Sequence, residues 1–274
     1  MRNTISILLI LIIYSCNLLQ INKSVIRIIG SDTMLELTKH LADEFNKEYP
    51  NILITVEGGG SKHGIEKLIN GKADICTSSR KLYPEEAKKM VENYNSLGVA
   101  NLIAIDALSI FVNVDNPVEN LSNSELKNIF IGKIKNWKKL NSDSLDIKTV
   151  IRNKDSGTYL FFKEYILEGE EYDKNSITLP TTKEIIDFIK ENKNAIGYGG
   201  IGYAKNVKII AVNGIIPNAE NILNNKYLYF RYLYFFTVKE PEGEIKLFID
   251  WINSPKGQKV VRESGYFPLL NIKE

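Results

Sequence analysis

The stretch "NLIAIDALSIFVN" (residues 101–113) is too apolar and too long to be a simple strand of one small sheet. We interpret it as a strand that crosses between two lobes. A second run, "YLYFRYLYFFTV" (residues 227–238), is aromatic and rich in β-forming residues, which fits a return crossing. Two crossings predict two lobes that are joined by a two-strand hinge.

On both sides of the first crossing, short β-like runs alternate with helical patterns. This alternation is typical of βα units and mostly parallel sheets, so the predicted fold class is α/β. Strands are expected at 25–29, 52–56, 73–76, 148–151, 195–198 and 207–212, and helices after 33, 64 and 83, at 125–129, 158–167 and 185–189, and near the C-terminus.

The first residues form a targeting segment. A positive start and the apolar run "ISILLILII" (5–13) predict an export signal, because the run is too short to span a ~30 Å hydrocarbon core. The run is followed by Ser15-Cys16 and resembles a bacterial lipoprotein signal, in which Cys16 carries the lipid. Ordinary signal-peptidase cleavage is the alternative. The predicted limits are 1–23 for signal and tether, 24–107 with 239–274 for the first lobe, and 108–238 for the second.

Composition and charge exclude several classes of protein. The 274 residues carry 35 basic and 33 acidic side chains without a basic block, so nucleic acid is not an expected partner. Only two cysteines occur. Cys76 lies in an apolar run and is expected in the core. No cysteine–histidine cluster suggests a metal site.

Turns rich in hydroxyl groups precede several of the expected helices. They read "IGSDTM" (29–34), "GGGSKHG" (58–64), "TSSRK" (77–81) and "DSGTY" (155–159). A helix N-terminus has free N–H groups and a partial positive charge, and glycine lets the backbone approach a ligand. A single turn of this kind is explained by ordinary N-capping. The recurrence favours a shared anion site at the carboxyl ends of the strands.

These turns, with "AIGYGGIGYA" and "SPKGQKVVRESGYFPL", resemble the phosphate-binding proteins of bacterial ABC transporters over nearly the whole mature chain. The most specific element is R-x-x-x-S-G-T. The resemblance implies a type II periplasmic-binding-protein fold, an inorganic phosphate ligand and no cofactor. It also implies a periplasmic location and membrane permease subunits as partners. The lipid anchor is expected from the signal at Cys16, and a monomer suits a protein that carries its ligand to a transporter. The implied phosphate contacts are Ser31, Thr33, Ser61, Ser79, Arg80, Arg152, Ser156, Gly157 and Thr158.

The sequence departs from the family pattern near Ser79. Some members have an aspartate there that accepts a proton from bound phosphate and so rejects sulfate, whereas this chain reads Ser78-Ser79-Arg80. Asp32 or a backbone carbonyl is a candidate for this acceptor, with N-capping as the other interpretation of Asp32. A protein for another oxyanion, such as sulfate or molybdate, is therefore an alternative.

Two further classes of function are weighed. An enzyme that uses Ser156 as nucleophile needs a base, and His63 is the only credible one, so we expect no catalysis. A surface lipoprotein that binds another protein would expose an apolar patch, and the run at 227–236 is the candidate. The glycines of "GYGGIG" (197–202) match a dinucleotide fingerprint, but no room remains for the helix that such a site requires.

Overall fold

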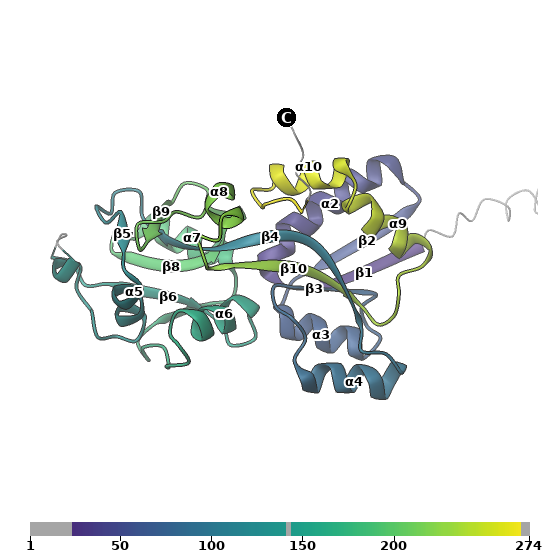
Figure 1. Cartoon of the computed structure of the whole chain (residues 1–274), viewed down its shortest axis with the longest axis horizontal. Helices are drawn as coiled ribbons and strands as arrows, with labels where there is room; N and C mark the ends of the chain where they lie inside the picture. Colours follow the sequence, from purple (N-terminus) through teal and green to yellow (C-terminus); the bar gives the residue numbers. More distant parts are fainter. Residues whose placement is uncertain (1–23, 141–143, 270–274) are drawn as a thin grey trace, which may run out of the picture.

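The computed structural model describes residues 24–140 and 144–269. The signal segment and Cys16 lie outside these residues. Two lobes lie side by side along the longest axis of the molecule, and two long strands run between them (Figure 1). The type II two-lobe fold that the sequence predicts is confirmed.

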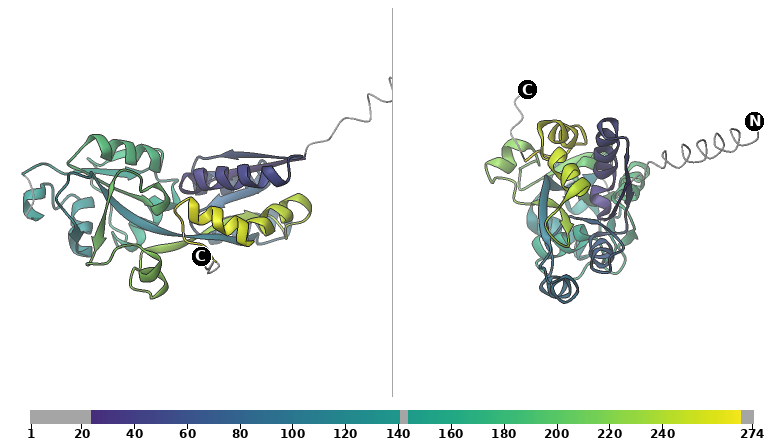
Figure 2. Two further views of the ribbon diagram at one scale, coloured as in Figure 1. Left: turned by 90° about the horizontal axis from the view of Figure 1, so that it is seen from above. Right: turned by 90° about the vertical axis from the view of Figure 1, so that its right-hand side faces the viewer.

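The first lobe combines a parallel sheet with helices on its faces. Strand β1 pairs with β2 and β3 in parallel, so their carboxyl ends meet at one edge. The C-terminal helix α10 packs on α2 and α9, which brings both ends of the described chain into this lobe (Figure 2). Its elements are β1 (Ser24–Gly30), η2 (Asp32–Met34), α2 (Leu35–Glu48), β2 (Ile52–Glu57), α3 (Ser61–Ile69), β3 (Ile75–Ser78), α4 (Pro84–Tyr94), α9 (Gly243–Ile252) and α10 (Pro255–Glu263).

The second lobe repeats this arrangement with shorter elements. Strand β6 pairs with β7 and β8 in parallel. Its elements are β5 (Asn120–Leu121), α5 (Asn123–Phe130), η3 (Trp137–Leu140), β6 (Lys148–Arg152), α6 (Gly157–Tyr165), β7 (Ile177–Leu179), α7 (Thr182–Glu191), β8 (Ala195–Gly200), η4 (Ile201–Tyr203), β9 (Lys208–Val212) and α8 (Ala219–Leu223).

Strands β4 (Val99–Val112) and β10 (Phe230–Thr237) are the predicted crossings. They are antiparallel to each other, and β4 then pairs with β8 of the second lobe. Residues 234–236 of β10 pair with β3 of the first lobe, although the predicted limits assign them to the second lobe. The exact lobe limits stay a proposal.

Each lobe has its own core. Phe45, Phe248 and Trp251 pack edge to face in the first lobe, and Phe162 stacks on Tyr198 in the second. Cys76 is fully buried, as predicted, and burial raises the pKa of its thiol. Most of the 227–236 run is buried. Leu228 and Tyr232 are exposed but not contiguous in sequence, so the run is mainly part of the fold and does not form a continuous exposed stretch.

Three further details bear on function. After β8 the chain forms only the three-residue η4, so the glycine run has no helix of the kind that holds a dinucleotide. His40 is partly exposed, and its Nδ1 contacts the Ser264 hydroxyl at 2.9 Å. Within the described parts of the chain, no helix is long and apolar enough to cross a membrane.

Candidate functional site

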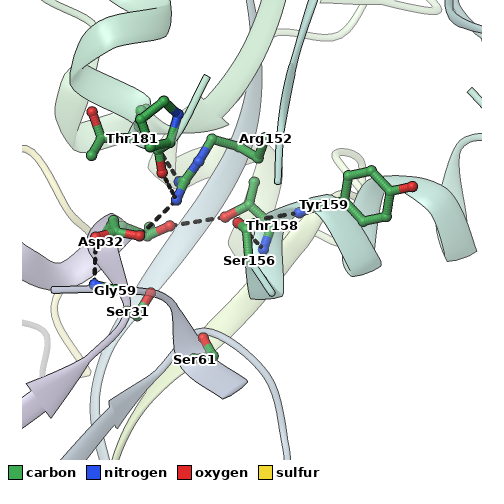
Figure 3. A network of polar contacts seen from close by, with 12 residues as sticks. Ser31, Asp32, Gly59, Ser61, Arg152, Ser156, Thr158, Tyr159 and Thr181 are labelled. Carbon is green, nitrogen blue, oxygen red and sulfur yellow. Dashed lines mark hydrogen bonds and ion pairs between the residues drawn. The ribbon is translucent and has the colours of Figure 1, made fainter. Parts of the chain in front are cut away.

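The hydroxyl-rich turns meet where the two lobes face each other. The turns that follow β1, β2 and β3 belong to the first lobe, and the turn that follows β6 belongs to the second. Figure 3 shows Ser31, Asp32 and Ser61 on one side of this junction, and Arg152, Ser156 and Thr158 on the other. The carboxyl ends of the parallel strands thus bring the predicted residues together, as the sheet geometry requires.

A buried ion pair links the two lobes. Arg152 at the end of β6 donates from Nη2 to Asp32 Oδ2 at 2.7 Å, and the two side chains are 1% and 6% exposed. Asp32 also accepts a hydrogen bond from the Gly59 backbone N–H at 2.9 Å. Burial lowers the pKa of Arg152, and the charge of Asp32 opposes that change. Asp32 is therefore an interlobe partner of Arg152 and not a simple helix cap.

Arg152 is also fixed from within its own lobe. Its Nη1 donates to Thr182 Oγ1 at 3.0 Å, and its Nη2 donates to the Pro180 carbonyl at 2.7 Å. Its Nε has no hydrogen-bond partner among the described residues although it is buried. The guanidinium is thus held rigidly, and one buried donor remains free for a ligand.

Small hydroxyl groups converge around the start of α6. Thr33 and Thr158 share a hydrogen bond of 2.8 Å across the lobes, and Ser61 and Ser79 contact each other at 3.3 Å. A Cβ atom added to Gly157 would lie 2.6 Å from the Ser79 hydroxyl and 2.8 Å from that of Ser61. Only glycine permits this approach, so the second lobe presents bare backbone to the first-lobe serines.

Ser156 caps α6. Its Oγ accepts hydrogen bonds from the N–H groups of Thr158 at 3.2 Å and Tyr159 at 3.4 Å. The capping interpretation is therefore correct for this residue, but its hydroxyl proton is still available to a ligand, because a hydroxyl donates as well as accepts. The N-terminus of α6 carries a partial positive charge that favours an anion at the same place.

The first turn is held from several directions. The backbone N–H of Ser31 donates to the Thr77 carbonyl at 2.9 Å, and Ser31 is buried. Tyr203 donates to the Asp32 carbonyl at 2.6 Å, and Tyr266 donates to the Thr33 carbonyl at 2.5 Å. These contacts position the side chains of the turn toward the other lobe.

Arg80 is oriented differently from Arg152. Its Nη1 and Nη2 donate to the two carboxylate oxygens of Glu86 at 2.8 and 2.7 Å, and its guanidinium lies over the Tyr83 ring at 4.1 Å. Its terminal N–H groups are thus engaged within the first lobe. The assignment of Arg80 as a phosphate contact stays a prediction.

Lys62, in the first turn of α3, bridges the lobes at the rim. Its Nζ contacts Asp155 Oδ1 at 3.1 Å, and both side chains are about half exposed. Such an exposed pair contributes little to stability. His63, the candidate base, lies with its ring against the backbone of Gly59. The two hydrogen bonds that the Ser156 hydroxyl accepts come from N–H groups of α6 and not from His63.

The sequence interpretation missed Arg231. This arginine lies on β10, is 6% exposed, and donates from Nη2 to Thr158 Oγ1 at 2.8 Å. It also pairs with Asp106 of β4, which is fully buried. A signal existed: an arginine and an aspartate interrupt the two otherwise apolar crossing runs, and buried charges are rare unless they are paired.

Known proteins resemble this chain over most of its length. The model of the PBP superfamily domain matches residues 20–256. The phosphate-binding protein PstS of Bacillus subtilis is 32% identical over 252 residues, which cover 89% of this chain and 80% of the relative. This chain belongs to the PstS family of phosphate-binding proteins. The family predicted from the sequence is confirmed.

Solved structures place the chain within the same PstS fold. A Clostridium perfringens protein that was crystallised with bound phosphate is 29% identical, has a TM-score of 0.84, and is matched over 90% of this chain and 100% of its own. An ABC-type phosphate transport receptor from Vibrio cholerae is 30% identical with a TM-score of 0.71, over 88% and 99% of the two chains.

Membership of the PstS family makes this chain a solute-binding protein. Among the residues that the structure describes, no group of three His, Cys, Asp or Glu side chains gathers in a way that would hold a metal ion. The polar groups at the junction are instead hydroxyls, backbone N–H groups and two arginines, each paired with an aspartate. Such donors suit an oxyanion.

Proposed function

We propose that this chain binds inorganic phosphate between its two lobes and delivers it to the permease subunits of an ABC transporter. One observation carries the proposal: Arg152 and the Ser156–Gly157–Thr158 turn of the second lobe meet Asp32, Thr33 and the first-lobe serines. The family relationship supports the same ligand. The proposed contacts are Ser31, Asp32, Thr33, Ser61, Ser79, Arg152, Ser156, Gly157 and Thr158, with Arg80 at the edge of the site.

Binding would use closure of the lobes about β4 and β10. A ligand that contacts both lobes stabilises the closed arrangement by its differential affinity for that state. Backbone N–H groups, hydroxyls and Arg152 donate hydrogen bonds to phosphate oxygens without a metal ion. A solute-binding role needs no nucleophile, and we propose that the protein is not an enzyme.

Selectivity for phosphate would depend on Asp32. One of its oxygens accepts from Gly59 and the other from Arg152, and each carboxylate oxygen has a second lone pair. A protonated phosphate oxygen can donate to such a lone pair, whereas sulfate has no proton to give at neutral pH. With sulfate this additional hydrogen bond cannot form and two oxygen lone pairs would face each other; a hydrogen bond to a charged group contributes about 1.5–3 kcal/mol, so its loss would disfavour sulfate.

The location and partners extend from the same proposal. Lipid attached to Cys16 would tether the folded domain to a bacterial membrane on the periplasmic side, where a monomer would pass its ligand to the permease. Metabolic labelling with a radioactive fatty acid, compared between the full chain and the Cys16→Ala variant, tests the lipid. Labelling of both proteins would place the modification elsewhere.

The deciding experiment is calorimetric titration of the domain that begins at Ser24, after ligand has been removed by partial unfolding and refolding. We expect tight binding of one phosphate per chain and weak or no binding of sulfate and molybdate. Tight sulfate or molybdate binding would favour the alternative oxyanion function. No response to any of these anions would overturn the proposal and favour a role in protein interactions.

A further inference from the structure

Arg231 and Asp106 face each other across the two hinge strands. They are direct partners in the register of β10 and β4. Arg231 donates from Nε and Nη2 to Asp106 Oδ2 at 3.0 and 2.9 Å, and Asp106 Oδ1 accepts from the Ile201 N–H at 3.0 Å. One edge of the guanidinium is therefore fixed against the hinge carboxylate.

The other edge of the guanidinium faces the anion site. A guanidinium is planar, and the N–H bonds on the edge shared by Nη1 and Nη2 run parallel. On this edge Nη2 donates to Thr158 Oγ1 at 2.8 Å, so Nη1 presents a donor in the same direction. Arg231, Ser79 and Gly157 also line one pocket between the lobes.

The Nη1 group of Arg231 is buried and has no hydrogen-bond partner among the described residues. A buried donor without an acceptor is costly and rare in folded proteins. The ring of Phe161 lies 5.4 Å from the guanidinium carbon and limits access of water on that side. An anion held at Thr158 would supply the missing acceptor.

We propose that Arg231 is a second arginine of the phosphate site. Its Nη1 donates to a phosphate oxygen, while its Nη2 holds the Thr158 hydroxyl that also contacts Thr33 of the first lobe. Because Asp106 neutralises it, Arg231 adds directed hydrogen bonds without adding net charge. This inference rests on the proposed function and extends it to a hinge residue.

A purely structural role is the competing explanation, because the Arg231–Asp106 pair also fastens β10 to β4. The two explanations predict opposite changes in phosphate affinity for Asp106→Asn when the partners are replaced one at a time. If the pair only fastens the hinge, Arg231→Met and Asp106→Asn should weaken phosphate binding alike. If Arg231 donates to the ligand, Arg231→Met should weaken binding, and Asp106→Asn should tighten it because a nearby negative charge disappears.

The experiment is phosphate titration of the wild-type domain, Arg231→Met, Asp106→Asn and the double variant, with thermal unfolding of each. We expect Arg231→Met to weaken phosphate binding roughly 10- to 150-fold, the range for one hydrogen bond to a charged group. The double variant should stay weak. Arg27→Met is the matched control, because Arg27 forms a similar two-bond pair with Asp74 in the first lobe and should leave the affinity unchanged.

Wild-type affinity in Arg231→Met, or recovery of affinity in the double variant, would overturn the inference. If Arg231→Met does not fold, Arg231→Lys replaces it: an ammonium keeps the charge but cannot reach Asp106, Thr158 and phosphate at once, so weaker binding is again expected. A wild-type domain that binds no phosphate would refute the proposed function itself. Loss of binding in Arg152→Ala with normal binding in Arg231→Met would refute only this inference.

Discussion

The molecule contains two buried arginine–aspartate pairs that connect different parts of it. Arg152 and Asp32 come from different lobes, whereas Arg231 and Asp106 lie on the neighbouring strands β10 and β4 of the hinge. In each pair both side chains are at most 6% exposed. Their chemistry is the same, and only their position in the fold differs.

Because of this difference in position, the two ion pairs respond differently when the lobes open. When the lobes separate, Arg152 and Asp32 must part and become hydrated, so their interaction enters the balance between open and closed forms. Arg231 and Asp106 stay paired through the register of their strands whatever the lobes do. A buried pair is weak support for stability but strongly penalises the loss of one partner. One pair therefore suits a switch, and the other a fixed support.

Removal of the interlobe arginine should have an effect as large as that expected for Arg231→Met. Arg152→Ala should weaken phosphate binding by roughly 1.5–3 kcal/mol, because a charge-assisted hydrogen bond to the ligand is lost. It also leaves Asp32 buried beside the anion without its counter-charge. Calorimetric titration measures the effect, with Arg27→Ala as the control for removal of an arginine elsewhere. Unchanged affinity would remove Arg152 from the site.

A smaller effect on the balance between open and closed forms should distinguish the interlobe pair from the hinge pair. Asp32→Asn keeps a hydrogen-bond acceptor for Gly59 but removes the charge that holds Arg152, so the closed form should lose about 1–3 kcal/mol. Spin labels on Lys72→Cys and Lys139→Cys, exposed positions in the two lobes, report the distance between lobes. Without phosphate, the mean distance should increase in Asp32→Asn.

Asp106→Asn supplies the matched comparison in the same labelled background. Its carboxylate lies between strands that do not separate, so the distance between lobes should stay at the wild-type value. Equal lengthening in both variants would mean that the hinge pair also sets the lobe equilibrium. The distinction between a switch and a support would then fail.

Much of this architecture could be predicted from local patterns. The two crossings are long apolar runs, and the βα units repeat a strand followed by a glycine- and hydroxyl-rich turn, so both leave periodic signals. Short elements do not: β5 and β7 have two and three residues, and α8 has five, which is too little for a period to show. Packing against neighbours decides such segments.

The site could be predicted in its residues but not in its pairings. The R-x-x-x-S-G-T motif gave Arg152 directly, but its contact with Asp32 spans 120 residues and depends on how the lobes meet. Arg231 was missed because a strand of aromatic residues suggests a core, and its partner Asp106 lies 125 residues away. Only the fold brings them together. For Arg80 the sequence does hold a local signal that its guanidinium is already paired. Glu86, six residues further on, accepts hydrogen bonds from Arg80 Nη1 and Nη2.

The smallest expected effect comes from a third pair, Arg27 and Asp74, whose side chains are 48% and 25% exposed. Arg27→Met should change the free energy of unfolding by only about 0–1 kcal/mol, because exposed pairs are hydrated and screened. Urea unfolding at neutral pH measures it. A loss as large as that expected for a buried pair would mean that burial does not distinguish the three pairs.

The pH dependence of this third pair gives a second check. Burial raises the pKa of Asp74, but hydrogen bonds and the charge of Arg27 outweigh burial and hold it below its ordinary 3.8. A carboxyl whose pKa is lowered by folding stabilises the protein above its unfolded value, and this contribution is lost as the pH falls through the folded value. The difference in stability between wild type and Arg27→Met should therefore be largest at neutral pH and should vanish once the pH has fallen below the lowered pKa of Asp74. A difference that persists in acid would come from packing of the Arg27 side chain and not from its charge.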